Sequence, residues 1–434
     1  MALDRRQFLA SAAALLVSPR PRVLSIEPLG PFLMDCTLPG ERRVDDVFPA
    51  HPNGLQLSPD RWLILYGTRG FRGVDDDRST NYQIRKGGPN GPMIREGFFR
   101  QTRDDWDPYN QGRKYSRQGG HAVAFGVPKG VRAPHANVFV AKWYVHARLL
   151  DPSRNYLEHG TVDIGFPGPK TFVEGLQFRL NDREDDLDIL RPAETTKPNV
   201  DCAWMNQPFV PAVPFNADAT EWADVMGFDG GRVAAAKYVW NPKTGLYDWT
   251  ATGPFLGNDL FEASLARHRD AWVISARRTK GGTAWIRTAD PFTATGSPVL
   301  PKTPETTAPL TTFACGDGAI RVFSGDKGGR DPLYMWDVDP DRDFACTNAR
   351  VIFDSVKAGL KIRPASQPKV DMCKLLPPQG RTQLALFRVS VRSFNHPYPK
   401  RPEIPIVNDE EKAACGIYAA KITYAEPVAP RWEF

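Results

Sequence analysis

Short apolar runs alternate with turn residues along most of the chain. Runs such as HAVAFGVP, TVDIGFPG and QLALFRVSVRS carry β-branched and aromatic residues, and several alternate apolar and polar positions with a period of two. Such runs favour β-strands, and the 40 prolines and 36 glycines spread between them favour turns. Only REDDLDIL and DEEKAA have the pattern of short helices. The chain is therefore predicted to be nearly all β.

The 434 residues show no break that would divide them into two domains. All-β architectures that stay one unit at this length include propellers and solenoids. The length fits a single β-propeller of roughly five to seven four-stranded blades, with about six favoured. We expect this domain over residues 46–434, after a linker over residues 23–45.

Composition and motifs exclude several classes of function. Hydrophobic residues make up 41% of the chain, and the formal net charge is +6. No Lys/Arg block is interleaved with aromatic residues, so we expect no nucleic-acid partner. The sequence lacks G-x-S-x-G, a Walker loop, a dinucleotide fingerprint and the Cys/His spacings of metal sites. We therefore expect neither a cofactor nor a metal ion.

The N-terminus carries a targeting pattern. Arg5 and Arg6 precede Phe8, Leu9 and an apolar run of roughly ten residues, which is too short to span a bilayer. This order resembles a twin-arginine export signal. The resemblance implies a signal segment over residues 1–22, the twin-arginine export machinery as a partner, and a periplasmic or secreted protein. No A-x-A cleavage site follows, which leaves membrane tethering through an uncleaved segment open; an amphipathic helix is the alternative.

The six cysteines are far apart and form no C-x-x-C pair. Export would place them in a compartment that permits disulfides. We expect one or two structural bridges, whose pairing the sequence does not define.

Three turns each contain a glycine and are followed by a tryptophan on the next strand. They are NPKTGLYDWTATGPF (241–255), RTKGGTAWIRTADPF (278–292) and SGDKGGRDPLYMW (324–336). Glycine takes φ > 0 in a hairpin, and each tryptophan is expected to pack between neighbouring blades. The turns resemble degenerate Asp-box turns (S-x-D-x-G-x-T-W) of the sialidase family. This resemblance implies a sialidase-like propeller.

The order of charged motifs resembles the same family. In sialidases an early blade carries a strand followed by an arginine and an acid/base aspartate, and LILYGTRGFRGVDDD occupies that place. A later blade carries a Glu-x-Ser strand and then a strand ending in arginine; here FEASLARHRDAWVISARR supplies Glu262, Ser264 and Arg277. The resemblance implies an exo-acting glycoside hydrolase whose substrate is an anionic glycan or polysaccharide.

The family's chemistry implies roles for these residues. Arginine suits a sugar carboxylate because its planar fork donates paired hydrogen bonds, and hydrolysis needs an acid and an opposing nucleophile. The resemblance implies Arg69 or Arg72 as the first arginine and Arg277 as the second. Glu262 would activate a tyrosine nucleophile. The resemblance also implies that the acid/base is one of three consecutive aspartates, Asp75, Asp76 and Asp77, of which we favour Asp76.

The third arginine and the tyrosine each have more than one candidate. Arg388 and Arg392 offer the arginine, and Arg392 is the one we assign to substrate binding. Tyr334 and Tyr398 offer the tyrosine.

Other interpretations of these motifs stay open. His135 and His146 would line a polar centre, and His121 and His135 would bind substrate. Alternatively, His121 or His135 would be the base of a polysaccharide lyase in which arginine neutralises a uronate. The alternative for each histidine is a hydrogen-bonded residue of a strand without a functional role. The alternative for the three aspartates is a turn exposed to solvent. A furanosidase-like variant would pair one of those aspartates with Glu262. A propeller with decayed Asp boxes would bind carbohydrate or protein without catalysis.

Overall fold

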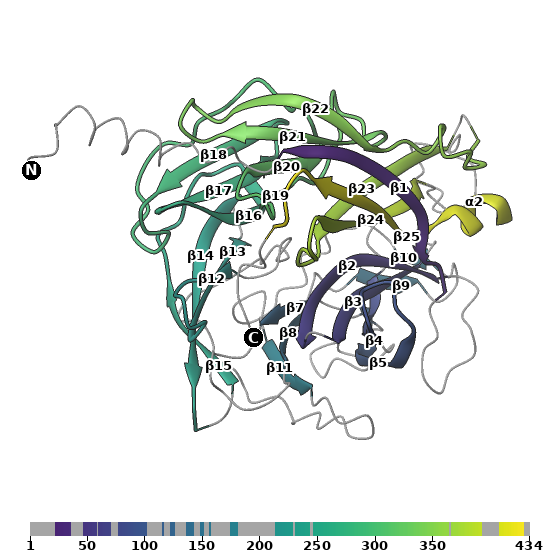
Figure 1. Cartoon of the computed structure of the whole chain (residues 1–434), viewed down its shortest axis with the longest axis horizontal. Coiled ribbons are helices and arrows are strands. Elements are labelled where there is room, and N and C mark those ends of the chain that lie inside the picture. The colour runs from purple at the N-terminus through teal and green to yellow at the C-terminus, as the bar shows by residue number, and fades with distance from the viewer. Residues whose placement is uncertain are drawn as a thin grey trace, which may run out of the picture.

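Figure 1 shows a computed structural model of the chain. It describes residues 22–35, 47–58, 60–70, 77–101, 115–116, 122–125, 136–142, 148–151, 156–157, 174–180, 213–228, 231–243, 246–363, 366–392 and 408–428. Over these residues the chain is almost entirely β, with the short helix α2 (Asp409–Ala414) before the last strand. In this part of the chain no helix is long and apolar enough to cross a membrane.

The strands of the N-terminal half form three sheets. Their strands are, in spatial order, β2 (Val47–Ser58), β3 (Arg61–Gly70), β4 (Asp77–Lys86) and β5 (Met93–Gln101); β7 (Ala122–Phe125), β8 (Ala136–Lys142) and β11 (Glu174–Leu180); and β6 (Tyr115–Ser116), β9 (Arg148–Asp151) and β10 (Tyr156–Leu157).

The strands of the C-terminal half form four further sheets. They are β12 (Val213–Pro214), β13 (Glu221–Phe228), β14 (Arg232–Asn241) and β15 (Leu246–Thr252); β16 (Leu260–His268), β17 (Ala271–Arg278) and β18 (Thr283–Thr288); β19 (Thr311–Ala314), β20 (Ile320–Ser324), β21 (Leu333–Asp339) and β22 (Ala345–Phe353); and β23 (Gln367–Leu375), β24 (Thr382–Arg392), β25 (Gly416–Tyr424) and β1 (Val23–Leu33).

The sheets follow one another around a common centre. Strand β2 packs against β7 on one side and against β23 to β25 on the other, while β16 packs against both β13 and β19, and β19 against β23. These strands surround the middle of the view in Figure 1. Antiparallel sheets that contact each other in this radial order form a propeller. The all-β propeller predicted from the sequence is confirmed.

The ring is closed by the first strand of the chain. Strand β1 pairs antiparallel with β25, so that Ile26 lies opposite Ile422 and Leu33 opposite Ile417. The sheet that contains the last strand therefore takes its outermost strand from the N-terminal segment. The linker expected over residues 23–45 is wrong for residues 23–33, because their apolar side chains pack on the core of this sheet.

Two of the three predicted glycine–tryptophan turns are described as hairpins, while the glycine of the third, Gly245, lies outside the described residues. Gly281 and Gly282 have φ of 89° and 79° between β17 and β18, and Gly328 has φ of 77° between β20 and β21. Trp285 is completely buried and stacks on Phe344 of the next sheet, with ring centroids 5.4 Å apart. Packing of this tryptophan between blades is confirmed.

The structure also tests the predicted short helices and disulfides. DEEKAA forms α2, whose N-terminus has a capping box between Asn408 and Glu411, while REDDLDIL lies outside the described residues. The four cysteines in the described part of the chain, Cys315, Cys346, Cys373 and Cys415, are all free thiols. The expected disulfides are therefore not formed among these four.

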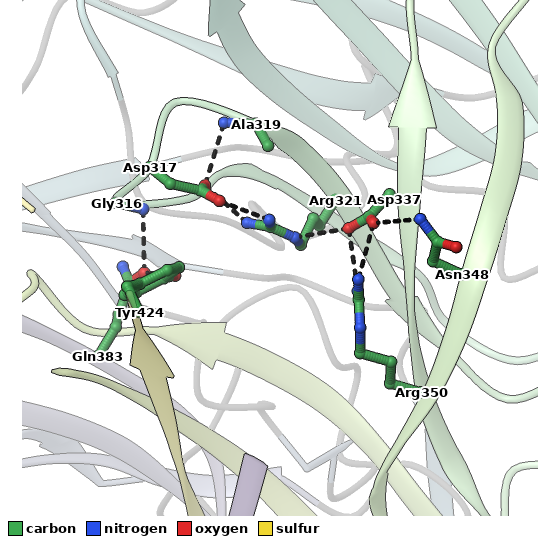
Figure 2. Close-up of polar contacts among 9 residues, drawn as sticks. All are labelled: Gly316, Asp317, Ala319, Arg321, Asp337, Asn348, Arg350, Gln383 and Tyr424. Atoms are coloured by element: carbon green, nitrogen blue, oxygen red, sulfur yellow. Dashed lines mark hydrogen bonds and ion pairs between the residues drawn. The ribbon is translucent and has the colours of Figure 1, made fainter. Parts of the chain in front are cut away.

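A polar network ties two neighbouring sheets together (Figure 2). Arg321 donates to Asp317 and Asp337 at distances of 2.5–2.7 Å, and Arg350 donates to Asp337 as well. Burial would raise the pKa of Asp337, but its bonds to Arg350, Asn348 and Arg321 lower that pKa to about 2. The turn beside Asp317 reaches the adjacent sheet through Gln383, which accepts from the Gly316 amide and from the Tyr424 hydroxyl.

Candidate functional site

Three inner strands carry the same irregularity. Each contains a β-bulge at a residue with positive φ: His51 in β2 (54°), Glu262 in β16 (51°) and Met372 in β23 (58°). Positive φ in a residue other than glycine costs on the order of 1 kcal/mol, so its recurrence indicates a shared constraint. A bulge breaks the normal alternation of side chains and re-aims those around it.

The predicted arginines share one position within their sheets. Arg69 and Arg277 are the next-to-last residues of β3 and β17, and Arg392 is the last residue of β24. Each of these strands pairs antiparallel with the inner strand of its sheet, so its end lies beside the start of that inner strand. The backbone therefore places all three arginines beside the start of the inner strand of their sheets, and only Arg277 pairs with the residue directly before the bulge.

Glu262 and Arg277 form an ion pair. Nη1 of Arg277 donates to Oε2 of Glu262 over 2.7 Å, and the side chains of Arg277 and Glu262 are 16% and 15% exposed. The Arg277 guanidinium also lies 4.6 Å from the ring centroid of Phe261, a cation–π contact that fixes its plane. Nε of Arg277 is buried and has no hydrogen-bond acceptor among the described residues. Two residues predicted from the sequence thus come together, with part of the arginine's donor set unused.

Asp371 lies between two arginines on the next bulged strand. Nη2 of Arg388 is 2.6 Å from its Oδ1, and Nη1 of Arg330, from the turn between β20 and β21, is 2.8 Å from its Oδ2. Asp371 and Arg388 are both buried. Burial would raise the pKa of Asp371, but the charges of Arg388 and Arg330 hold it well below its usual range. Arg388, a candidate third arginine, is therefore engaged by an internal carboxylate.

Two further charged residues are buried on β23 and β13. Lys374 follows the bulge of β23, and Asp224 lies on β13; they are 4% and 1% exposed. Burial raises the pKa of Asp224 to about 8. A hydrogen bond from the Val225 amide and the charge of Lys374 act in the opposite direction and lower this pKa. Burial lowers the pKa of Lys374 to about 7, while the charges of Asp224 and Glu262 act to raise it.

The remaining predicted residues are placed only in part. The backbone of Asp77 starts β4 and is the direct partner of Arg69 in β3, so an arginine and an aspartate of the predicted site are neighbours in the sheet. Six further candidates lie outside the described residues, namely Arg72, Asp75, Asp76, His121, His135 and Tyr398. The roles of all these residues stay predictions.

The tyrosine nucleophile is not found beside Glu262. Within the described ranges Glu262 hydrogen-bonds to Arg277 and to no tyrosine. Tyr334 is on β21 with its ring 5.2 Å from that of Trp336. The described residues also contain no group of three His, Cys, Asp or Glu side chains that could hold a metal ion.

Sequence reasoning missed Asp371, Lys374 and Asp224. All three are charged residues inside apolar strands, in KVDMCKLL and EWADVMGF. A charge in such a strand is costly to bury unless it is paired. The same signal singled out Glu262, and it would have found these residues too.

Comparisons with known proteins agree on the fold. No protein-family model matches the sequence, and no curated protein matches it. A protein of unknown function from Dyadobacter fermentans DSM 18053 has a TM-score of 0.56 at 9% identity, covering 93% of this chain and 100% of that chain. The K499G mutant of NanB sialidase from Streptococcus pneumoniae has a TM-score of 0.54 at 8% identity, covering 91% and 70%.

A second sialidase gives the same result. Trypanosoma rangeli sialidase in complex with 2,3-difluorosialic acid has a TM-score of 0.52 at 10% identity, covering 90% of this chain and 56% of that chain. This chain therefore spans little more than half of that protein. At such identities the likeness concerns the fold alone: the chain has a sialidase-like β-propeller fold.

Proposed function

We propose that this chain is an exported glycoside hydrolase that acts on an anionic glycan. The observation that carries the proposal is the ion pair of Glu262 with Arg277, 2.7 Å apart, at the bulged start of an inner strand. The sialidase-like propeller fold supports it. So does the common position of Arg69, Arg277 and Arg392 at the ends of second strands. Export rests on the twin-arginine pattern at Arg5 and Arg6.

Arg277 has the donors to bind a sugar carboxylate. A guanidinium carries five N–H groups, and Arg277 uses one nitrogen for Glu262 while its Nε is unmatched among the described residues. A bound carboxylate would compete with Glu262 for the guanidinium. Glu262 would then be released from part of its ion pair and could accept the proton of a nucleophile. The ion pair is thus a resting arrangement that substrate binding would open.

An acid for the leaving oxygen would come from the aspartate run. Hydrolysis of a glycosidic bond needs a carboxylic acid that protonates the leaving oxygen, opposite the group that attacks the sugar. The pairing of the Asp77 backbone with Arg69 supports a place for this run beside the first arginine. One of Asp75, Asp76 and Asp77 would take this role.

The test is hydrolysis of fluorogenic sialosides and uronides by the purified protein and by Glu262→Gln. We expect the substitution to lower kcat/KM by about 100-fold or more, because it removes a proton acceptor. Glu221→Gln is the matched control, because Glu221 also pairs with a cation, Lys237, on the neighbouring sheet. It should keep full activity. Full activity in Glu262→Gln would overturn the role of Glu262, and no hydrolysis of any substrate would overturn the proposal.

A carbohydrate-binding propeller without catalysis is the second candidate. It is favoured by the bonding of Glu262 to Arg277 and to no tyrosine of the described residues. Such a protein would bind anionic glycans without releasing product, and Glu262→Gln would leave that binding largely intact. A lyase with His121 or His135 as base would instead release an unsaturated product that absorbs in the ultraviolet.

A further inference from the structure

The bulges of β2, β16 and β23 have the same geometry. In each, two residues of the inner strand lie opposite a single residue of the second strand, and the first of the two has a φ between 51° and 58°. These first residues are His51, Glu262 and Met372. Because the direction of a Cβ atom follows from the backbone, the three side chains leave their strands in equivalent directions. The proposed reaction gives a role to Glu262 alone.

The bulges of β16 and β23 lie at one level of the ring, and β19 between them shows it. Ser275 is the partner of the residue directly after the β16 bulge, and its hydroxyl shares a hydrogen bond of 2.6 Å with that of Thr312 on β19. The neighbouring hydroxyl of Thr311 donates over 2.8 Å to the carbonyl of Cys373, the second residue of the β23 bulge. Two hydrogen bonds thus connect the two bulges through adjacent residues of one strand.

The bulge of β2 lies at the same level as that of β23. After the bulges, Gly54 of β2 packs against Leu376, so closely that a Cβ at Gly54 would lie 2.6 Å from Cδ2 of Leu376. Before the bulge, Phe48 and Ala50 belong to a buried cluster against which Val391, near the end of β24, packs. Both contacts match the two strands in height and direction. His51 and Glu262 therefore lie at the same level of the inner strands that surround the middle of Figure 1.

A side chain at such a bulge needs a reason. Glycine adopts positive φ without steric cost, whereas other residues lose on the order of 1 kcal/mol. A requirement of the backbone alone would therefore favour glycine. The chain instead has a histidine, a glutamate and a methionine at the three bulges, and the carboxylate of Glu262 binds Arg277 over 2.7 Å. A function of the imidazole would explain the histidine at position 51 in the same way.

The neighbour of each bulge on the second strand differs between the sheets. The residue that pairs with the one directly before the bulge is Arg277 in the sheet of Glu262, Arg388 in the sheet of Met372 and Gly67 in the sheet of His51. Arg277 and Arg388 each bind an internal carboxylate from this position. Gly67 has no side chain and is partly exposed. The place that a guanidinium takes beside Glu262 is therefore left to a ligand beside His51.

We infer that His51 is a substrate-binding residue of the Glu262 site, whose imidazole hydrogen-bonds the anionic sugar over Gly67. The inference rests on the proposed function, which supplies the class of substrate. A ring nitrogen of histidine can donate to a sugar hydroxyl or to a carboxylate. His51 is 8% exposed, and a hydrogen bond in so enclosed a place is stronger than one in water. Arg277 and His51 thus hold the sugar from two different sheets.

The test measures binding of the methyl glycosides of N-acetylneuraminic acid and glucuronic acid by calorimetry. Asparagine and glycine adopt positive φ readily, so His51→Asn and His51→Gly keep the bulge and should fold. Both should weaken binding by about 5- to 20-fold, because each removes one hydrogen bond to the ligand. Arg269→Asn is the matched control, because Arg269 also has positive φ (56°) but lies in the hairpin at the far end of β16. It should bind as the wild type does.

Nuclear magnetic resonance of the histidine rings gives a direct readout. The signals of His51 are those lost in His51→Asn, and saturating sugar should move them. Those of His268 should stay, because His268 is the last residue of β16, away from the bulge. Wild-type affinity in both His51 variants, or unmoved His51 signals in a protein that binds the sugar, would overturn the inference and leave the hydrolase standing. Moved signals without hydrolysis would support His51 and overturn the hydrolase, and no binding of either sugar would overturn both.

Discussion

Asp371 links two neighbouring sheets through ion pairs. It has no exposed surface, and it joins Arg388 of its own sheet to Arg330 from the turn of the neighbouring sheet. Its folded-state pKa is held below the unfolded value near 4, so its contribution to stability is present above about pH 4. That contribution is lost as pH falls through the folded-state pKa. The residue therefore links the two sheets at neutral pH and releases them in acid.

Asp371→Asn should destabilise the protein by about 3–5 kcal/mol, because it leaves Arg388 buried without a counter-charge. The stability of the variant should also depend less on pH below about pH 4 than that of the wild type. Urea unfolding at neutral and acid pH measures both effects.

Asp341→Asn is the control for this prediction. Asp341 is 40% exposed and pairs with Arg269 and Arg287 at the surface. Its loss should cost about 1 kcal/mol or less. Equal unfolding midpoints for Asp371→Asn and the wild type would contradict the structural role of Asp371.

At the scale of residues, the sequence predicts the site only where a motif marks it. Glu262 and Arg277 stood out because a family pattern and a charge in an apolar strand coincided, and they are in contact. Asp371 and Lys374 are also charged residues in apolar strands, but no family pattern includes them. The partner of a buried charge comes from another sheet, and no local pattern in the sequence names that partner. Arg388 was therefore a plausible ligand for substrate until Asp371 was found beside it.

At the scale of elements, bulges limit what alternation can predict. Alternation assigns each strand residue to one of two faces. The bulges at His51, Glu262 and Met372 shift that assignment within three inner strands. The turns, in contrast, were predictable, because glycine with φ > 0 followed by tryptophan is a local requirement of a hairpin that packs on its neighbour. The hairpins could thus be predicted from local sequence. Which face each side chain of the inner strands lies on could be determined only from the structure.

The element-scale prediction concerns Trp285 on β18. Trp285→Ala should destabilise the protein by about 3–5 kcal/mol, because the indole is fully buried and stacks on Phe344 of the adjacent sheet. The indole nitrogen also donates to Thr283 of its own hairpin over 3.0 Å. Chemical unfolding followed by fluorescence and circular dichroism measures the loss. Val356→Ala, at a side chain that is 79% exposed, should change stability by about 0.5 kcal/mol or less. Equal effects of the two substitutions would show that Trp285 does not join the sheets.

At the scale of the whole molecule, the ring depends on its first strand. Strand β1 was not predicted, because its sequence, VLSIEPLGPFL, contains two prolines and a glycine and reads as a linker. Those residues suit an outermost strand, since a proline lacks the N–H that would pair with another chain. Pro28 and Pro31 lie opposite Ala420 and Tyr418 of β25, with β1 at the edge of the sheet. The two prolines that made this segment resemble a linker therefore also protect the outer edge of the sheet from pairing with another chain.

Removal of β1 should open the ring at β25. A chain that starts at Met34 loses the hydrogen bonds between β1 and β25 and the burial of Leu33, a cost of about 3 kcal/mol or more. It also exposes β25 as an edge strand that can pair with other molecules. We expect a lower urea midpoint and aggregation that increases with protein concentration, measured by unfolding curves and light scattering. A chain that starts at Arg22 keeps β1 and is the control. Identical midpoints and identical scattering for the two chains would mean that β25 is stable as an edge, and that closure by β1 does not maintain the ring.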